Sequence, residues 1–318
     1  MNILVPKTIT EAMFGAGTNI PAVDASVGEV AWASGTNYTV GQRRVSAGYT
    51  YECVQAISSG PQNTYAPEDS RSIGYWQKDE GAPTNRKAPF DKYLFTKARR
   101  AGSVTYVLNM PFPDGAAIYG IEGDALDITV KAGPGGANLI PPLHVDLWQQ
   151  AFGPWELLFG ELQRGTYYGL KNIPLYPAAE ITITVSRNSP SDQAAIGFVS
   201  VGNWKRLLAP RQGNVSGAQY GVEATTKDYS YLKENDDGTY TEKAGRMATN
   251  INISCVIDAS QAPAAKSLLD QILGKAVAIE ASGLSRYGHL ATVGKVTGTV
   301  RSTNWDTAQV DLQIKGNV

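Results

Sequence analysis

Few side chains in this sequence have the types and spacing that catalysis requires. Neighbouring carboxylates, which could act as a general acid and base, occur as Asp124 with Asp127 and in the run Asp236-Asp237. Both pairs lie in turn contexts, where aspartate usually caps the local backbone. No Cys-x-x-Cys or His-x-x-x-His spacing predicts a zinc site, and the chain has only two histidines. We therefore expect no enzyme, no catalytic residue, no cofactor and no metal site.

Aromatic side chains between residues 32 and 76 offer a different chemistry. The apolar faces of a sugar ring stack on aromatic planes, and sugar hydroxyls bind polar side chains such as glutamine. The candidate glycan-binding residues are Trp32, Tyr38, Tyr51, Tyr75, Trp76 and Gln55. However, a module of roughly 50 residues has few other side chains with which to build a core. Burial of several of these rings is therefore the alternative interpretation.

Composition argues against several classes of function. The chain has 28 lysine and arginine residues against 29 aspartate and glutamate residues, so a basic nucleic-acid-binding surface is not expected. No apolar stretch approaches the roughly 18 residues that span a bilayer, and the first residues lack a signal-peptide pattern. Cys53 and Cys255 each lie in an apolar strand pattern, which favours buried free thiols over a disulfide. We expect a soluble protein without membrane insertion, made in a reducing cytoplasm.

The glycine, proline and tyrosine content favours strands and turns over helices. The predicted fold class is mainly β with one α+β unit. In chain order, the expected segments are an irregular N-terminal arm (1–28), a small aromatic β-module (29–80), a linker (81–98), a β-sandwich (99–205) and an α+β unit consisting of a sheet with one helix (206–318).

Period-two patterns of β-branched residues predict the strands, and a period of 3.6 residues predicts the helix. Strands are expected over 38–42, 49–56, 103–108, 125–130, 181–185, 250–257, 277–280, 290–300 and 308–315. The run Asp236-Asp237-Gly238 predicts a hairpin turn. The helix is expected to have Ser260 as its N-cap and to end at Gly274. A second group of aromatic residues is interpreted as sandwich core or as a subunit contact: Trp148, Trp155, Phe159, Tyr167 and Tyr168.

The region from 32 to 76 resembles the small chitin-binding-type carbohydrate modules found on chitinases and cellulases. The matching residues are Trp32, Tyr38, Gly41, Val45, Tyr51, Cys53, Pro67 and Trp76. This resemblance implies a small β-module with a role in binding polysaccharide. Gln42 stands where these modules usually have aspartate, which is a departure from their pattern.

The following segment is similar to a motif of tailed-bacteriophage structural proteins that carry such a module near the N-terminus. Their motif reads Gly-Pro-Thr-Asn-Arg-x-x-x-Phe-Asp. The matching residues here are Pro83, Thr84, Asn85, Arg86, Phe90 and Asp91. Lys87 and Pro89 replace residues that are usually large and apolar. The resemblance, which continues at 173–177, 218–221 and 227–230, implies a tail component of the virion, assembled in the host cytoplasm.

The 206–318 unit is similar to the tail-tube-like domains that assemble side by side into phage rings. Its alternating strand at 308–315 is expected to be a sheet edge that pairs with a neighbouring subunit. The prediction is a structural protein of the distal tail or baseplate, in a homo-oligomeric ring of six or three copies. Its partners would be other phage tail proteins and host cell-surface polysaccharide. The alternatives are a neck or head–tail connector component and a secreted carbohydrate-binding accessory protein.

Overall fold

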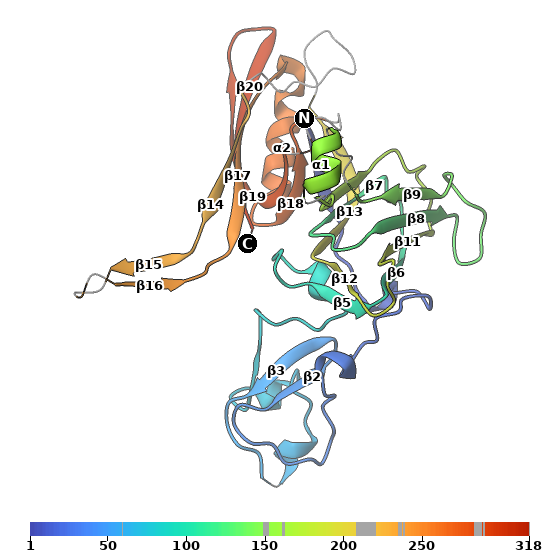
Figure 1. The fold of residues 1–318 in the computed structure, drawn as a ribbon, viewed down its shortest axis with the longest axis vertical. Helices are drawn as coiled ribbons and strands as arrows, with labels where there is room; N and C mark the ends of the chain where they lie inside the picture. The colour runs from blue at the N-terminus through green and yellow to red at the C-terminus, as the bar shows by residue number, and fades with distance from the viewer. Residues whose placement is uncertain are drawn as a thin grey trace.

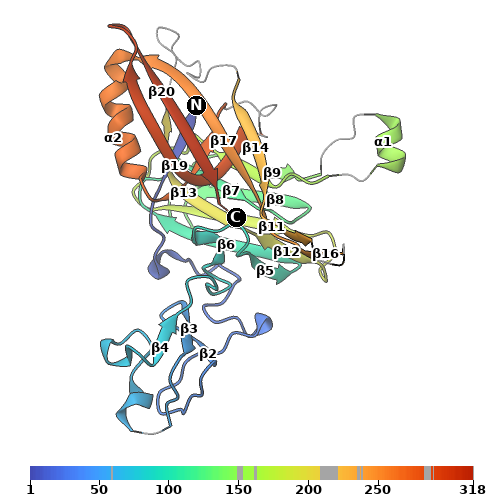
Figure 2. The same ribbon diagram turned by 90° about the vertical axis from the view of Figure 1, so that its left-hand side faces the viewer.

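The fold is mainly β, as predicted, and is built around one large curled sheet (Figure 1). The structure is a computed structural model that describes residues 1–58, 60–148, 153–160, 163–207, 221–234, 237, 239–282, 288 and 290–317. A small module, at residues 29–80, lies at one end of the molecule, and the rest of the chain forms the body (Figures 1 and 2).

A nine-stranded antiparallel sheet forms the centre of the body. From one edge to the other, its strands are β10 (Tyr167–Leu170), β7 (Gly115–Tyr119), β13 (Phe198–Arg206), β1 (Asn2–Pro6), β18 (Ala276–Glu280), β19 (Ala291–Ser302), β20 (Thr307–Gly316), β17 (Met247–Asp258) and β14 (Glu223–Asp228). The Tyr167 hydroxyl of β10 donates to the Glu280 carboxylate of β18, although three strands separate β10 from β18 in the sheet. The sheet must therefore curl strongly between these two strands.

The prediction of an irregular N-terminal arm is wrong for the first residues of the chain. Asn2–Pro6 forms β1, which pairs with β13 on one side and β18 on the other. The side chains of Ile3 and Leu4 are fully buried, on opposite faces of the sheet. The apolar run is only three residues long and ends at Pro6, so it shows no measurable period.

The prediction that 308–315 is an edge strand is also wrong. β20 pairs with β19 on one side and with β17 on the other, so it lies inside the sheet. The alternation of Val310, Leu312 and Ile314 with polar residues does report correctly that one face of this strand is buried. Alternation carries no information on whether the two backbone edges of the strand are paired. The edges of the sheet are β10 and β14.

Helix α2 (Ala262–Ile272) covers part of one face of the sheet (Figure 2). Leu268, Leu269 and Ile272 pack on a cluster of buried residues from β17, β18, β19 and β20. Ser260 is not the N-cap, because it lies in a 3-10 turn (Ala259–Gln261) that precedes the helix. Gly274, which has φ +77°, follows the helix and allows the chain to turn back toward β18.

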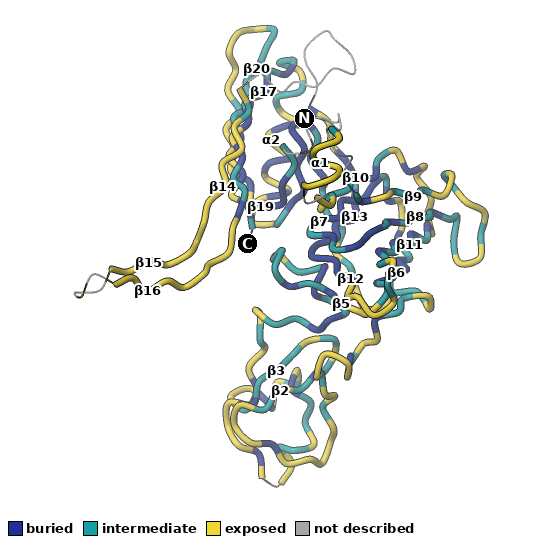
Figure 3. The backbone as a smooth tube through the Cα atoms, viewed as in Figure 1, coloured by how far each residue is buried: buried dark blue, intermediate teal, exposed yellow. Residues whose placement is uncertain are grey.

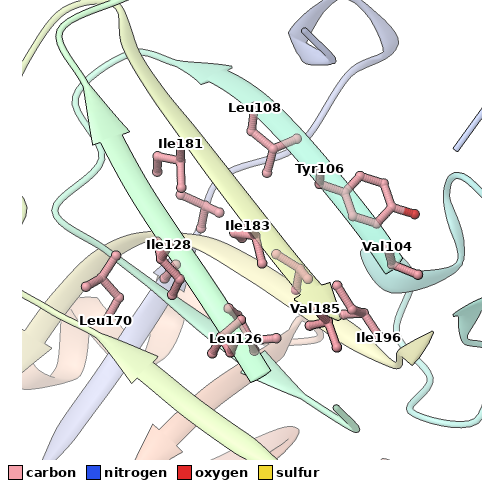
Figure 4. Packing of buried hydrophobic residues seen from close by; sticks show 14 of the residues in the cluster. Val104, Tyr106, Leu108, Leu126, Ile128, Leu170, Ile181, Ile183, Val185 and Ile196 are labelled. Carbon is pink, nitrogen blue, oxygen red and sulfur yellow. The ribbon is translucent and has the colours of Figure 1, made fainter. Parts of the chain in front are cut away.

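A second sheet covers another part of the same face and completes a sandwich. Its strands are β6 (Ser103–Met110), β11 (Ala179–Ser186), β8 (Ala125–Lys131) and β9 (Leu143–Asp146), in that spatial order. The strands predicted at 103–108, 125–130 and 181–185 are thus confirmed. Their inward side chains, such as Tyr106, Ile128 and Ile183, pack in a core that also includes residues of β7 and β13 (Figure 4). Burial of each such aliphatic side chain contributes about 1.5–3 kcal/mol.

The body does not divide at the boundary expected between 205 and 206. β13 runs through that position, and its partner β1 pairs in turn with β18 from the last third of the chain. The sandwich and the helix-bearing unit therefore share one sheet. A short additional pair, β5 (Ala98–Ala101) with β12 (Gln193–Ile196), lies beside the sandwich.

The small module contains a three-stranded antiparallel sheet of β2 (Arg43–Ser46), β3 (Tyr49–Cys53) and β4 (Trp76–Lys78). The first strand begins later than the predicted 38–42, because Gly41 takes φ +85° and interrupts extended backbone. The expected loop between β3 and β4 contains two 3-10 turns, Pro61–Thr64 and Ser70–Ser72. Other 3-10 turns in and near the module are Glu11–Met13, Ala25–Val27 and Ala88–Phe90.

Candidate interaction sites

The aromatic residues proposed for glycan binding form the core of the module. The exposed fraction is 2% for Tyr38, 8% for Tyr51 and 6% for Trp76, and all three pack with Cys53 and Ile57. The rings of Tyr38 and Trp76 meet edge to face, with centroids 5.0 Å apart. A sugar can stack only on a ring face that solvent reaches, so these three residues cannot provide a stacking platform in this conformation. The alternative interpretation, burial, is correct for them.

The remaining proposed residues lie around this core and are more exposed than it. Trp32 and Tyr75 are half-buried and pack against the core cluster. Gln55 is exposed, and its backbone N–H donates to the Tyr75 carbonyl at 3.4 Å. The structure therefore brings the five aromatic residues together, but mainly as packing.

The segment expected to be a linker is partly buried and joins the module to the body. We call residues 83–91 the junction segment. Asn85 is 7% exposed, and its side chain makes three hydrogen bonds. The amide nitrogen donates to Asp24 Oδ2 at 2.7 Å and to the Arg99 carbonyl at 3.0 Å, and Oδ1 accepts from the Arg99 N–H at 2.8 Å. Its backbone N–H donates to Glu29 Oε1 at 2.6 Å.

The other polar residues of the junction segment have similar roles. Arg86 Nη1 lies 3.0 Å from Glu11 Oε1, and its guanidinium stacks 4.5 Å from the centre of the Phe14 ring. The Arg86 carbonyl accepts a hydrogen bond from the Tyr106 hydroxyl at 2.9 Å. Thr84 is fully buried, and its carbonyl accepts from two following N–H groups. These contacts hold the N-terminal segment, the module and the sandwich in one arrangement.

Phe90 and Asp91 extend the junction segment into the body. The Phe90 ring meets the Tyr106 ring edge to face at 5.2 Å. Asp91 accepts hydrogen bonds from the Tyr93 N–H and the Thr96 hydroxyl, both at 2.7 Å. Burial raises the pKa of Asp91 to about 6, despite these stabilising hydrogen bonds. The motif residues therefore have a structural role in joining the parts of the chain.

A pocket of about 530 Å³ lies between the module and the body. On the module side it is lined by residues 27–30, 43–45 and 50, and on the body side by residues 82, 83, 85, 88, 95–97 and 99. Its lining includes the basic residues Arg43, Arg44, Lys97 and Arg99. The sequence gives no indication of this site, because the two pairs of basic residues are more than fifty positions apart and no spacing rule connects them.

A β ribbon projects from the body into solvent (Figure 3). It consists of β15 (Tyr231–Glu234) and β16 (Tyr240–Lys243), which pair beyond the end of β14 and β17. The predicted hairpin is confirmed by this pairing, although Asp236 and Gly238 of its turn lie outside the described residues. Every residue of β14, β15 and β16 is exposed. At the base of the ribbon, the Arg246 guanidinium lies 3.3 Å from the centre of the Phe95 ring.

Helix α1 (Pro154–Phe159) presents a second exposed apolar surface, well away from the body (Figure 2). Trp155, Leu158 and Phe159 are 75%, 70% and 69% exposed, and the two rings lie 4.4 Å apart. The loop that carries this helix is anchored where the Arg164 guanidinium stacks on Trp148 at 3.9 Å. Trp155 and Phe159 are therefore not sandwich core, which leaves a subunit contact as the other interpretation.

No cluster that could bind a metal ion is found in the described part of the chain. Within the ranges given above, no group of three or more His, Cys, Asp and Glu side chains is placed to hold a metal ion. In the same ranges, no helix has the length and hydropathy needed to cross a bilayer. Cys53 and Cys255 are buried free thiols, as predicted, and burial raises the pKa of Cys255 to about 11.

No protein-family model, curated protein or solved structure matches this chain.

Proposed function

We propose that this chain is a non-enzymatic structural protein of a bacteriophage virion. It would assemble with copies of itself into a ring at the distal tail or baseplate. The motif resemblance at residues 83–91 suggests the virion, and the exposed ribbon suggests the assembly. The exposed side chains of the ribbon, β15 and β16, are the main structural support for the proposal.

The ribbon exposes apolar side chains on both of its faces. Leu232 and Tyr240 share one face and are 64% and 63% exposed, and Tyr231, on the other face, is 55% exposed. An isolated two-stranded hairpin is only marginally stable in water, and grouped exposed apolar side chains mark interaction sites. A partner that covers both faces would supply the missing packing.

The open edges of the large sheet favour a second copy as that partner. β14 forms one edge, and its six residues are all exposed, while β10 forms the other edge. Among the described residues neither edge has a further partner strand. A chain with two different free edges can form head-to-tail contacts, and such contacts close into a ring when the rotation per subunit allows it. Helix α1 gives each subunit a further apolar contact surface for a neighbour or for another tail protein.

The small module would project from such a ring. It lies at the end of the molecule, away from α2 and the ribbon (Figure 1). In that position it either contacts host-surface glycan or binds a neighbouring tail protein. A neck or head–tail connector remains the alternative within the virion. Burial of Tyr38, Tyr51 and Trp76 weighs against the other alternative, a secreted carbohydrate-binding accessory protein that stacks its ligand on these rings.

The assembly proposal can be tested with purified protein and with virions. We expect the full chain to form rings visible by electron microscopy and to be detected in virions by mass spectrometry. The double variant Leu232→Asp, Tyr240→Asp should stay monomeric without a change in thermal stability of the body. Val40→Asp is the matched control, because Val40 is 64% exposed but lies on the module. A wild-type protein that stays monomeric and is absent from virions would contradict the proposal.

A further inference from the structure

The pocket between the module and the body has the size of a small-molecule site. Its volume of about 530 Å³ lies within the range of roughly 300–1,000 Å³ that is typical of ligand pockets, which often form between domains. Asn85 holds the two sides in place, because its backbone N–H donates to Glu29 on the module side and its side chain pairs with the backbone of Arg99 on the body side. The pocket is therefore part of the fixed geometry of the junction.

The charge of the pocket lining is positive. Four basic residues and one acidic residue, Glu29, contribute to it. Both oxygens of Glu29 are already occupied, because Oε1 accepts from the Asn85 N–H at 2.6 Å and Oε2 accepts from the Asp24 N–H at 2.7 Å. The one carboxylate of the lining is thus engaged by the backbone and does not pair with the basic side chains of the pocket.

Two of the four basic residues, Arg44 and Arg99, form no salt bridge among the described residues, although Arg99 lies close enough to Glu122 to help lower the pKa of that carboxylate. Arg43 Nη2 lies 3.2 Å from Glu52 and 3.2 Å from Asp79, and Lys97 pairs with Glu122. The Arg44 guanidinium donates to the Arg43 carbonyl at 2.6 Å and lies 5.3 Å from the centre of the Tyr38 ring.

No described carboxylate lies within 4 Å of the guanidinium of Arg44 or of Arg99. A guanidinium group presents a planar set of donors that matches a carboxylate or phosphate, so these two residues are suited to an anion. The net charge of the whole chain is only −1, so this local excess of positive charge is not a general property of the protein.

Apolar groups form the rest of the pocket wall. Val27 and Val30 are 49% and 51% exposed, which is high for valines in a recess, and Pro83 and Phe95 contribute further carbon surface. A small inorganic anion would use the arginines but leave this wall uncovered. A ligand that carries both an anionic group and an apolar ring face would use both.

We propose that this pocket binds an acidic saccharide unit, that is, a sugar ring that carries a carboxylate or a phosphate. Arg44 and Arg99 bind the anionic group, and the valine and proline surface packs on the ring. The inference rests on the glycan-contact part of the proposed function, but it moves that contact from the buried aromatic core to the junction. It does not depend on ring assembly.

Isothermal titration of the purified full chain tests this proposal. The ligands are a glucuronate disaccharide, glucose 6-phosphate, a neutral glucose disaccharide and inorganic phosphate. We expect at least one acidic sugar to bind at least tenfold more tightly than the neutral sugar and than inorganic phosphate, with affinity falling as salt is added. The acidic sugar that binds more tightly shows whether the pocket prefers a carboxylate or a phosphate. Binding of inorganic phosphate as tightly as the sugars, or no binding of either acidic sugar at millimolar concentration, would overturn it.

Matched variants locate the binding. Arg44→Gln and Arg99→Gln should each weaken binding of the acidic sugar about tenfold or more, because each removes a charge-assisted hydrogen-bonding group. Arg301→Gln is the control, since Arg301 is an exposed arginine on β19 with a side chain 67% exposed. Circular dichroism checks that each variant is folded. Unchanged affinity in both pocket variants would overturn the proposal, and ring formation measured separately shows whether the assembly proposal fails with it.

Discussion

Asn85 and Arg99 form a reciprocal hydrogen-bonded pair across the junction. The Asn85 side chain accepts from the Arg99 N–H at 2.8 Å and donates to the Arg99 carbonyl at 3.0 Å. The pairing imitates the contact between two antiparallel strands, although it joins a side chain to a backbone. It explains why Asn85, in a motif that looks like a polar linker in the sequence, is only 7% exposed in the structure.

Asn85→Ala should destabilise the protein by about 3 kcal/mol, because it leaves the buried partners at Arg99 and Asp24 without hydrogen bonds. Chemical denaturation measures this change. Asn37→Ala, at an exposed asparagine of the module, is the control and should change stability by less than about 0.5 kcal/mol. Equal effects of the two substitutions would contradict the structural role of the junction.

Trp76→Ala should unfold the small module while the body stays folded. Removal of a buried tryptophan costs about 3–5 kcal/mol, and the module has few other core residues to compensate. Limited proteolysis should show cleavage within residues 29–80. Trp305→Ala is the control, since Trp305 is 88% exposed. A variant that resists proteolysis like the wild type would show that Trp76 is not needed for the core and would reopen its role as a sugar platform.

The sequence was informative where one face of a strand is buried. The alternation of Val104, Tyr106 and Leu108 predicted β6, and similar patterns predicted β8, β11 and β17. Alternation depends only on side-chain burial, so it could not tell that β20 is an interior strand. The alternation also missed β1, because β1 is held in the sheet by pairing with β18, whose residues lie near position 280.

The candidate sites were predictable only in part. Residue type identified the aromatic cluster, but Tyr38 and Trp76 are equally suited to a core and to a stacking surface, and only burial distinguishes these roles. The motif at 83–86 was recognised, but its role depends on partners as distant as Glu11 and Tyr106. The pocket could not be predicted, because the fold alone brings Arg44 and Arg99 to the lining of one recess.

Lys171→Met should cost about 3–5 kcal/mol of stability. Lys171 pairs with Glu280, whose side chain is only 6% exposed, and the substitution leaves a buried carboxylate without its cation. Burial, with the neighbouring Tyr119 and Glu280, raises the pKa of Tyr167, so its hydroxyl stays protonated and still donates to that carboxylate. Urea denaturation measures the loss.

The pair of Lys266 with Asp270 provides the control for Lys171→Met. Both side chains of this pair are more than 60% exposed on α2, so Lys266→Met should cost less than about 0.5 kcal/mol. If Lys171→Met is as mild as Lys266→Met, the ion pair between Lys171 and Glu280 does not stabilise the curl of the sheet.

Asp91 should make the protein lose stability as the pH rises from about 4 to 6. Burial raises the folded-state pKa of Asp91 to about 6 from an ordinary value of 3.8, so the folded protein holds this proton more tightly than the unfolded chain does. The contribution is fully present below pH 3.8 and is lost as the pH rises through 6. Because the carboxyl is partly exposed, we expect an effect of only about 1 kcal/mol.

Asp91→Asn should remove this dependence, so the variant gains stability relative to the wild type between pH 4 and pH 7. Urea midpoints measured at several pH values over this range test the prediction. Asp311→Asn is a control for which the pH dependence of stability runs in the opposite direction, because hydrogen bonds from Ser254 and Gln309 lower the pKa of Asp311. Its stabilising contribution is present above the ordinary pKa and is lost as the pH falls. A stability difference between Asp91→Asn and wild type that stays constant with pH would show that Asp91 does not titrate in this range.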